Sequence, residues 1–569
     1  MSSVSSKSFL RLLEWLFCGY LYVICAGRAE AIESLPTDNS KYQAIRKVYE
    51  DVARAAGNGR TPPRLVVVPV HAVHQMMIAW CEPGTEGGIG VEGASGHLLE
   101  GYIAIEERVY DLLISLGGDR DNALAFLLGH ELTHYYLRHG WVGDFGNAFA
   151  SLDVGKKMQR VANYEQAVKL ETEADYFGGF YGYLAGYNTL TVAPRMLEMV
   201  YAAYRMPDQV PNYPSRSDRI AIAARTEANL RKMVPVFDAG VRLLVVERYE
   251  EAARLFDYLA HTFPSPEMFN NAGVAYALEA IHLFPPGKLR FIYPFEYDAA
   301  TRLHGRENRT RSIADDSEER CSRLLRKANE CFEEALQRER EYVPALANQA
   351  AVTNIQGEVD TALLYASRAV TLAKRQNETQ ALAAALVARG IALAESGDRG
   401  RALMDFAAAR NHGLASGAYN HSVLMGEKEL QTAAGCEVDG PRREAIGGRT
   451  PREPFVKDKD TASFILGEKE PGLPAITIKT RLRENWEESQ VGMGSRLLTM
   501  LATDPGYPGT TSRGINIGSS FRDVYTKYGQ PTRQFPSRQG RSVIYQNPGI
   551  VFTINRDEQV SGWMVYFAQ

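Results

Sequence analysis

Apolar positions along the 569-residue chain change their spacing several times, and each change predicts a different kind of element. Short runs rich in β-branched residues predict strands at 63–70 (PRLVVVPV) and 102–105 (YIAI). Two longer segments, 121–139 and 162–186, predict helices, and the first is apolar on most sides, as a buried helix is. Residues 40–230 are therefore expected to form a mixed domain of helices and strands.

Small and aromatic residues recur at fixed offsets in the Ala-rich, helical region 233–425. Alanines lie twelve residues after Gly240, Ala350 and Gly390, and aromatics lie four residues after Ala252, Ala328 and Ala402: they are Phe256, Phe332 and Phe406. The pattern, with a period near 34 residues, resembles the tetratricopeptide repeat, which implies an α-solenoid of paired helices. Residues 283–316 lack a helical period and predict an insertion in this array.

The rest of the chain predicts a linker and a small domain. Residues 430–475 are rich in Gly, Pro and charge and predict a polar linker. In 476–569, a strand, a turn and a helix begun by Ser519 or Ser520 are expected over 514–531, followed by strands of alternating apolar residues. This layout resembles the small BamE-like modules of exported bacterial proteins, and an unspecialised α+β domain fits it equally well.

Composition adds little to this picture except at the N-terminus. The chain is 45% hydrophobic with a net charge of −4, which is typical of a folded domain and gives no support for nucleic-acid binding. Lys7 and Arg11 precede an uncharged run at 15–27, and AEA follows at 29–31. This arrangement predicts a secretory signal over residues 1–31 and a periplasmic protein, with an uncleaved membrane anchor as the alternative.

The cysteine spacing does not predict a metal site. Four cysteines follow the signal segment, and none forms a CxxC pair: Cys81, Cys321, Cys331 and Cys436. In an exported chain they form two disulfides or stay free, and the sequence leaves both states open.

The segment HELTH carries the strongest chemical signal. His130 and His134 are one helical turn apart, about 40° around the helix axis, so both imidazoles can bind one zinc ion. Glu131 lies on the neighbouring flank, where it can accept a proton from an activated water. Burial of three polar side chains in an apolar helix without partners would be costly, and a metal would satisfy them.

The third ligand must come from elsewhere. Leu137 and Gly140 exclude the metzincin pattern, and His139 lies on about the opposite helix face from His130. A later helix offers Glu171 and Asp175, which share a face, whereas Glu173 points elsewhere. One of the two can bind zinc while the other holds a ligand histidine by its free N–H.

HExxH followed by ExxxD resembles the gluzincin family of HtpX, CAAX-processing and BepA-type proteases. The resemblance implies a zincin-like domain, with Glu171 as the zinc ligand and Asp175 behind the histidine; the gap of 37 residues from His134 to Glu171 favours this group. Pro214 and Arg219 match the family's downstream HPxxxxR, but Tyr213 replaces its His. Tyr213 is expected to bind the oxyanion, to act as a gate or simply to pack, and Arg219 to serve catalysis or a buried ion pair.

Together these features predict an exported metalloendopeptidase with one Zn²⁺ per chain, acting on protein or peptide substrates in quality control. The repeats would recruit substrates or partner proteins. The alternative is a repeat-based binding or chaperone protein with a latent peptidase domain. A single apolar segment does not fit a multi-span membrane protein. Two further expectations concern the cleft. Residues 102–105 are expected to form either an edge strand for substrate or a plain structural strand, and 140–161 is a candidate plug.

Overall fold

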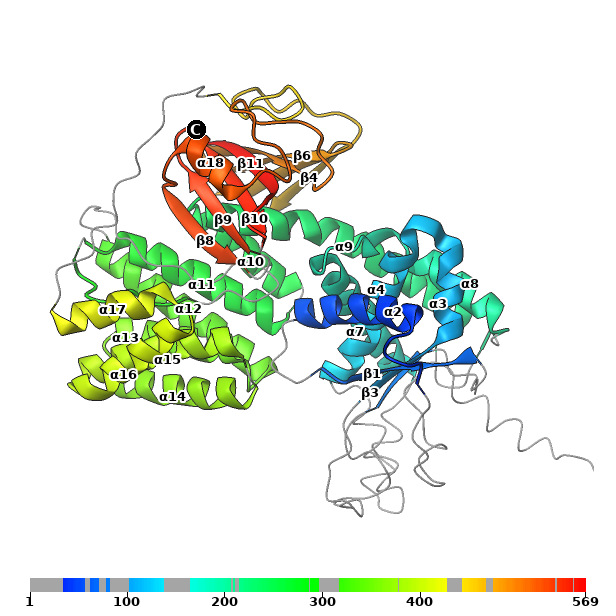
Figure 1. The fold of residues 1–569 in the computed structure, drawn as a ribbon, viewed down its shortest axis with the longest axis horizontal. Helices are drawn as coiled ribbons and strands as arrows, with labels where there is room; N and C mark the ends of the chain where they lie inside the picture. Colours follow the sequence, from blue (N-terminus) through cyan, green and yellow to red (C-terminus); the bar gives the residue numbers. More distant parts are fainter. Residues whose placement is uncertain are drawn as a thin grey trace, which may run out of the picture. The chain divides into compact units, whose positions relative to one another are not determined.

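The computed structural model (Figure 1) describes most of the chain beyond residue 33. The described residues are 34–56, 62–70, 78–81, 102–137, 164–205, 208–209, 214–262, 264–285, 287–295, 317–376, 378–426, 443–466, 474–537, 540–555 and 557–568. The chain divides into two compact units, 1–232 and 233–569. It is mainly helical, with a separate antiparallel sheet at the C-terminus.

The first unit combines a small sheet with several helices. Its elements are α2 (Ser40–Ala56), β1 (Arg64–Val68), β2 (Ile78–Cys81), β3 (Tyr102–Glu106), α3 (Glu107–Leu113), η2 (Ile114–Asp119), α4 (Arg120–Leu137), α7 (Tyr164–Leu184), η3 (Thr189–Thr191), α8 (Ala193–Ala203) and the first part of α9 (Arg216–Val245). The two predicted strands and the two predicted helices are all present, and α4 is buried along most of its length.

The expectation that 102–105 forms an edge strand is wrong. The strand order is β1-β3-β2, so β3 lies in the middle, parallel to β1 and antiparallel to β2. Both of its edges are hydrogen-bonded to neighbours, and no edge remains for an added peptide strand. The sequence could not show this, because β2 is too short to stand out as a strand.

The second unit begins with helices in which small and aromatic residues of the recurring pattern are in contact. After the end of α9 they are α10 (Tyr249–Thr262), α11 (Pro266–Leu283), α12 (Ser317–Arg338), α13 (Val343–Ile355), α14 (Val359–Arg375), α15 (Thr379–Glu395), α16 (Arg399–Asn411) and α17 (Ala415–Met425). The rings of Phe256, Phe332 and Phe406 lie directly over Gly240, Gly273 and Gly390. A Cβ at Gly390 would lie 2.6 Å from the Phe406 ring, so the glycines let the helices approach.

The C-terminal sheet has eight strands in the order β4-β5-β6-β7-β11-β10-β9-β8, all antiparallel. They are β4 (Thr461–Leu466), β5 (Ile476–Leu482), β6 (Trp486–Met493), β7 (Arg496–Thr503), β8 (Arg533–Ser537), β9 (Gly540–Tyr545), β10 (Ile550–Asn555) and β11 (Val560–Ala568). A capping box of Ser520 and Asp523 begins α18 (Phe521–Tyr528). Residues 514–518 form turns and irregular chain instead of the predicted strand.

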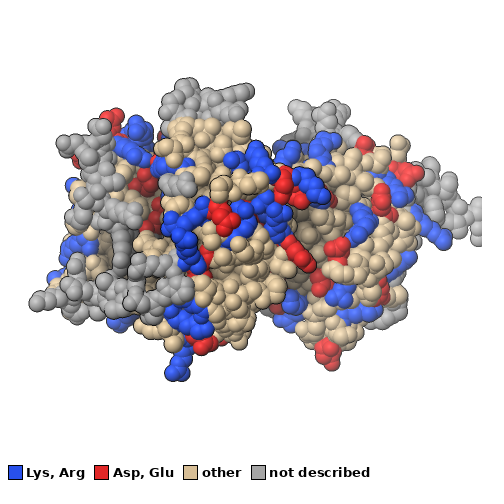
Figure 2. Space-filling model, turned by 90° about the horizontal axis from the view of Figure 1, so that it is seen from above, with Lys and Arg blue, Asp and Glu red and all other residues tan. Residues whose placement is uncertain are grey.

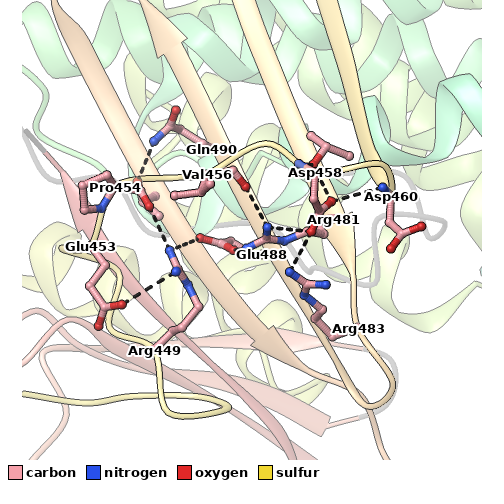
Figure 3. A network of polar contacts seen from close by, with 12 residues as sticks. Arg449, Glu453, Pro454, Val456, Asp458, Asp460, Arg481, Arg483, Glu488 and Gln490 are labelled. Carbon is pink, nitrogen blue, oxygen red and sulfur yellow. Dashed lines mark hydrogen bonds and ion pairs between the residues drawn. The ribbon is translucent and has the colours of Figure 1, made fainter.

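The predicted linker is in part a component of this sheet. Residues 461–466 form β4, and the preceding residues lie against β5 and β6 (Figure 3). Arg449 binds Glu488 at 2.8 Å, and Asp458 binds Arg481 at 2.9 Å. Arg481 and Glu488 are themselves cross-strand partners and are buried. The charged composition that suggested a solvated linker instead pairs with charges on the sheet.

Charges of both signs are interspersed on the face shown in Figure 2. In the described part of the chain, no helix is long and apolar enough to cross a membrane. Cys321 and Cys331 are free and buried. The predicted signal segment, Cys436 and the second half of the predicted insertion lie outside the described residues.

Candidate metal centre

The candidate site is built where α4 and α7 come into backbone contact. A Cβ at Gly129 would lie 2.5 Å from the carbonyl oxygen of Gly178, and one at Gly178 would lie 2.4 Å from the backbone nitrogen of His130. Any side chain there would push the helices apart. The adjacent Gly178 and Gly179 in the predicted helix 162–186 favour close packing from the sequence alone, but the sequence gives no indication of the partner, Gly129.

The crossing brings two histidines and a carboxylate together. Nε2 of His130 lies 3.0 Å from Nε2 of His134, and these atoms lie 3.4 and 3.6 Å from the oxygens of Glu171. Three ligands arranged tetrahedrally at zinc bond lengths of about 2.0–2.1 Å are about 3.3–3.4 Å apart. The three side chains are buried and form the only group of His, Cys, Asp and Glu of metal-binding spacing in the described residues.

Asp175 fixes the orientation of His130. Its Oδ1 lies 2.9 Å from Nδ1 of His130, so the carboxylate accepts the Nδ1–H and the Nε2 lone pair faces the centre. Arg219, at the start of α9, donates to both oxygens of Asp175, one bond measuring 2.6 Å, and its Nε lies 3.2 Å from Glu171. The buried ion pair expected as one role of Arg219 is therefore observed.

The centre attracts positive charge. Glu171 is 1% exposed, and neither of its oxygens has a hydrogen bond within the described part of the chain. Burial opposes its charge, but His130 and Arg219 outweigh burial and hold the pKa of Glu171 at about 2. Burial likewise opposes charge on His130, yet Asp175 and Glu171 raise its pKa to about 10. A proton or a metal cation therefore has a favourable place between these side chains.

Glu131 differs from Glu171 in its surroundings. It is buried beside His130 on α4, and burial raises the pKa of its carboxyl to about 7, with the charge of Glu171 acting in the same direction. A carboxyl that titrates near neutral pH can both accept and release a proton under ordinary conditions. Glu131 is therefore suited to proton transfer, whereas Glu171 stays ionised.

Some of the other residues considered from the sequence are described by the structure, and others are not. Glu173 is half-buried and pairs with Lys169 at 3.9 Å, outside the group, as its helical position predicts. Tyr213, His139 and segment 140–161 lie outside the described residues. Tyr201 of α8 lies within electrostatic range of Arg219 and Glu171, and burial raises its pKa to about 12. Sequence reasoning missed Tyr201, because one tyrosine in an amphipathic helix carries no signal.

Comparison with known proteins adds no family assignment. A scan against protein-family models found none that matches the chain, and a search of curated proteins found no match either. The chemistry of the site must therefore be inferred from its own geometry.

Proposed function

We propose that the protein is a zinc-dependent metalloendopeptidase. The observation that carries the proposal is the buried group of His130, His134 and Glu171, with donor atoms spaced as zinc ligands are. Two imidazoles and one carboxylate are a donor set found in catalytic zinc sites, where a fourth position stays open for water or substrate. A zinc ion held there supplies Lewis-acid activation of a carbonyl group and of water.

Other residues of the protein would transfer protons and hold the ligands in position. Glu131, which is buried next to His130 on α4, would take the proton of the attacking water and deliver it to the leaving amine. Asp175 orients His130, and Arg219 holds Asp175 and Glu171 in place. Arg219 thus acts through the carboxylates, as a positioning residue. For Tyr213, oxyanion binding stays a prediction.

The proposal extends to the fold of each part of the chain, its location and its biological role. We infer a zincin-like fold for the first unit, tetratricopeptide-like pairing for the helices of the second and a BamE-like module at the C-terminus. The helix pairs with glycine–phenylalanine contacts support the second of these. Export to the periplasm, a role in quality control and recruitment of protein substrates rest on the sequence patterns alone.

The decisive experiment measures zinc content and cleavage of an unfolded protein by wild type, Glu131→Gln and a matched Glu173→Gln control. We expect one zinc per chain in all three, chelator-sensitive cleavage by wild type and control, and a loss of at least 100-fold in Glu131→Gln. Full chelator-sensitive activity in Glu131→Gln would refute the assigned base. The absence of zinc from wild type would refute the metal site.

The alternative function is a repeat-based binding protein whose peptidase domain is latent. The run of paired helices from α10 to α17, with its glycine–phenylalanine contacts, supports this alternative, because stacked helix pairs offer an extended binding surface. Complementation of a deletion separates the two functions. Full rescue by Glu131→Gln supports binding as the main role, whereas rescue by wild type and Glu173→Gln alone supports proteolysis.

A further inference from the structure

The segment that follows α11 lies against several of the other repeat helices as irregular chain. Residues 289–295 (LRFIYPF) have no helical turn. Phe291, Tyr293 and Phe295 are each at most 5% exposed, and Pro294 is buried as well, whereas Ile292 is only half-buried. The three aromatic rings, at every second position of the segment, therefore all lie within the protein.

The contacts of this segment come from several different helices. Phe291 packs on Phe406 of α16, with ring centroids 5.9 Å apart. The hydroxyl of Tyr293 lies 3.4 Å from the amide nitrogen of Asn354, at the end of α13. The segment therefore crosses successive helix pairs, as a bound peptide would cross a solenoid surface.

Asn420 of α17 makes the contact that distinguishes this segment from simple core filling. Its side-chain oxygen accepts the backbone N–H of Ile292 at 2.8 Å, and its side-chain nitrogen donates to the Ile292 carbonyl at 2.9 Å. Asn420 is fully buried. An amide that satisfies both backbone groups of one residue holds an extended chain of any sequence, and the ring sites then select aromatic side chains.

We propose that this is a binding site for extended polypeptide segments with aromatic side chains at alternate positions, and that residues 289–295 are its internal occupant. The partner is an unfolded or strand-forming segment of another protein. The inference does not depend on the zinc site. Because the occupant is tethered, it competes at a high effective concentration, and an external peptide binds well only when the occupant is displaced or removed.

The test uses the full chain with residues 289–295 replaced by Gly and Ser. A fluorescent peptide with the sequence of residues 288–297, KLRFIYPFEY, is titrated and its anisotropy is measured. We expect one peptide per chain, bound at least tenfold more tightly than by wild type. Asn420→Ala in the same background should weaken binding about tenfold or more through two lost hydrogen bonds, whereas Asn411→Ala, exposed at the end of α16, should not.

A peptide of the same composition with its aromatic residues made contiguous serves as the specificity control. Equal binding of the control peptide, or no binding by a folded variant, overturns the proposal. If the variant does not fold alone, the peptide is added during refolding. Recovery of the native circular dichroism spectrum at one equivalent supports the site. Failure to recover shows that the segment is only part of the core and overturns the proposal.

Discussion

Asp175 links the two cationic parts of the candidate centre, since it accepts from His130 on one side and from Arg219 on the other. Asp175→Asn would remove the charge that both partners face and permit the wrong tautomer of His130. We expect zinc affinity to fall about 10- to 100-fold. Competition with a chromophoric chelator measures this change. Glu173→Gln, on the same helix, is the control, and equal zinc affinities in both variants would contradict the role.

At this scale the sequence predicted which side chains are neighbours on each helix, because helical spacing alone places His130 beside His134 and Glu171 beside Asp175. The sequence could not decide which of Glu171 and Asp175 faces the two histidines and which one orients His130. That assignment depends on distances between two helices and on Arg219, which arrives from a third helix 44 residues after Asp175.

Among the helices, the α4–α7 crossing is the contact on which the site depends. Gly178→Ala would place a methyl group against the backbone of His130 and force the helices apart. We expect a loss of roughly 1–3 kcal/mol in stability and a clear fall in zinc affinity. Calorimetry and chelator competition measure the two effects.

Gly118→Ala is the matched control, because a Cβ there meets nothing within 4 Å. Normal zinc binding by Gly178→Ala would contradict the prediction, because it would show that α4 and α7 can separate enough to accept a methyl group without loss of the site.

In the second unit, β6 is tied to α9 by a charge pair. Arg242 binds Glu487 at 2.6 Å; burial opposes the charge of Glu487, but Arg242 outweighs it and lowers the pKa of Glu487 to about 2. The folded pKa lies below the unfolded value, so the pair stabilises the fold above about pH 4.5 and this stability is lost as pH falls toward 2.

Glu487→Gln should therefore cost on the order of 1–3 kcal/mol at pH 7 and progressively less near pH 3. Hydrogen exchange of the β5 and β6 amides in urea, measured at both pH values, tests this expectation. The exposed Glu484→Gln is the control. A pH-independent difference between Glu487→Gln and wild type would mean that the charge of Glu487 is not responsible.

Elements with regular spacing were predictable, whereas partners distant in sequence were not. The contacts Gly240–Phe256 and Gly390–Phe406 follow from a shared offset in the sequence, whereas Gly273–Phe332 joins residues on either side of the insertion. The central place of β3 does not, because strand order is decided by the short β2. The many charged residues in 443–460 predicted a solvent-exposed linker. Composition alone cannot show that Arg449 and Asp458 form ion pairs with opposite charges on the sheet.

At the scale of the whole molecule, the three candidate ligands all lie within the first unit. Zinc binding should therefore stabilise that unit by about 2.7 kcal/mol at a free zinc concentration 100 times the Kd, and leave the second unit unchanged. Scanning calorimetry of the full chain, with zinc and with chelator, should show one transition that moves and one that does not.

His134→Ala should abolish the zinc-dependent shift in calorimetry while both transitions remain. A shift of both transitions by zinc in wild type would mean that the two units unfold as one, or that a second zinc site exists in the second unit.

The backbone contact between Gly129 and Gly178 also lengthens the signature by which such a site can be found in other sequences. Gly129 directly precedes His130, and Gly178 follows Asp175 by three residues. The searchable pattern is thus GHExxH followed by ExxxDxxG. Both glycines are required because the two helix backbones touch there. A chain that keeps every ligand but gains a bulky residue at either glycine is expected to have lost the metal centre, and would be misassigned by its ligands alone.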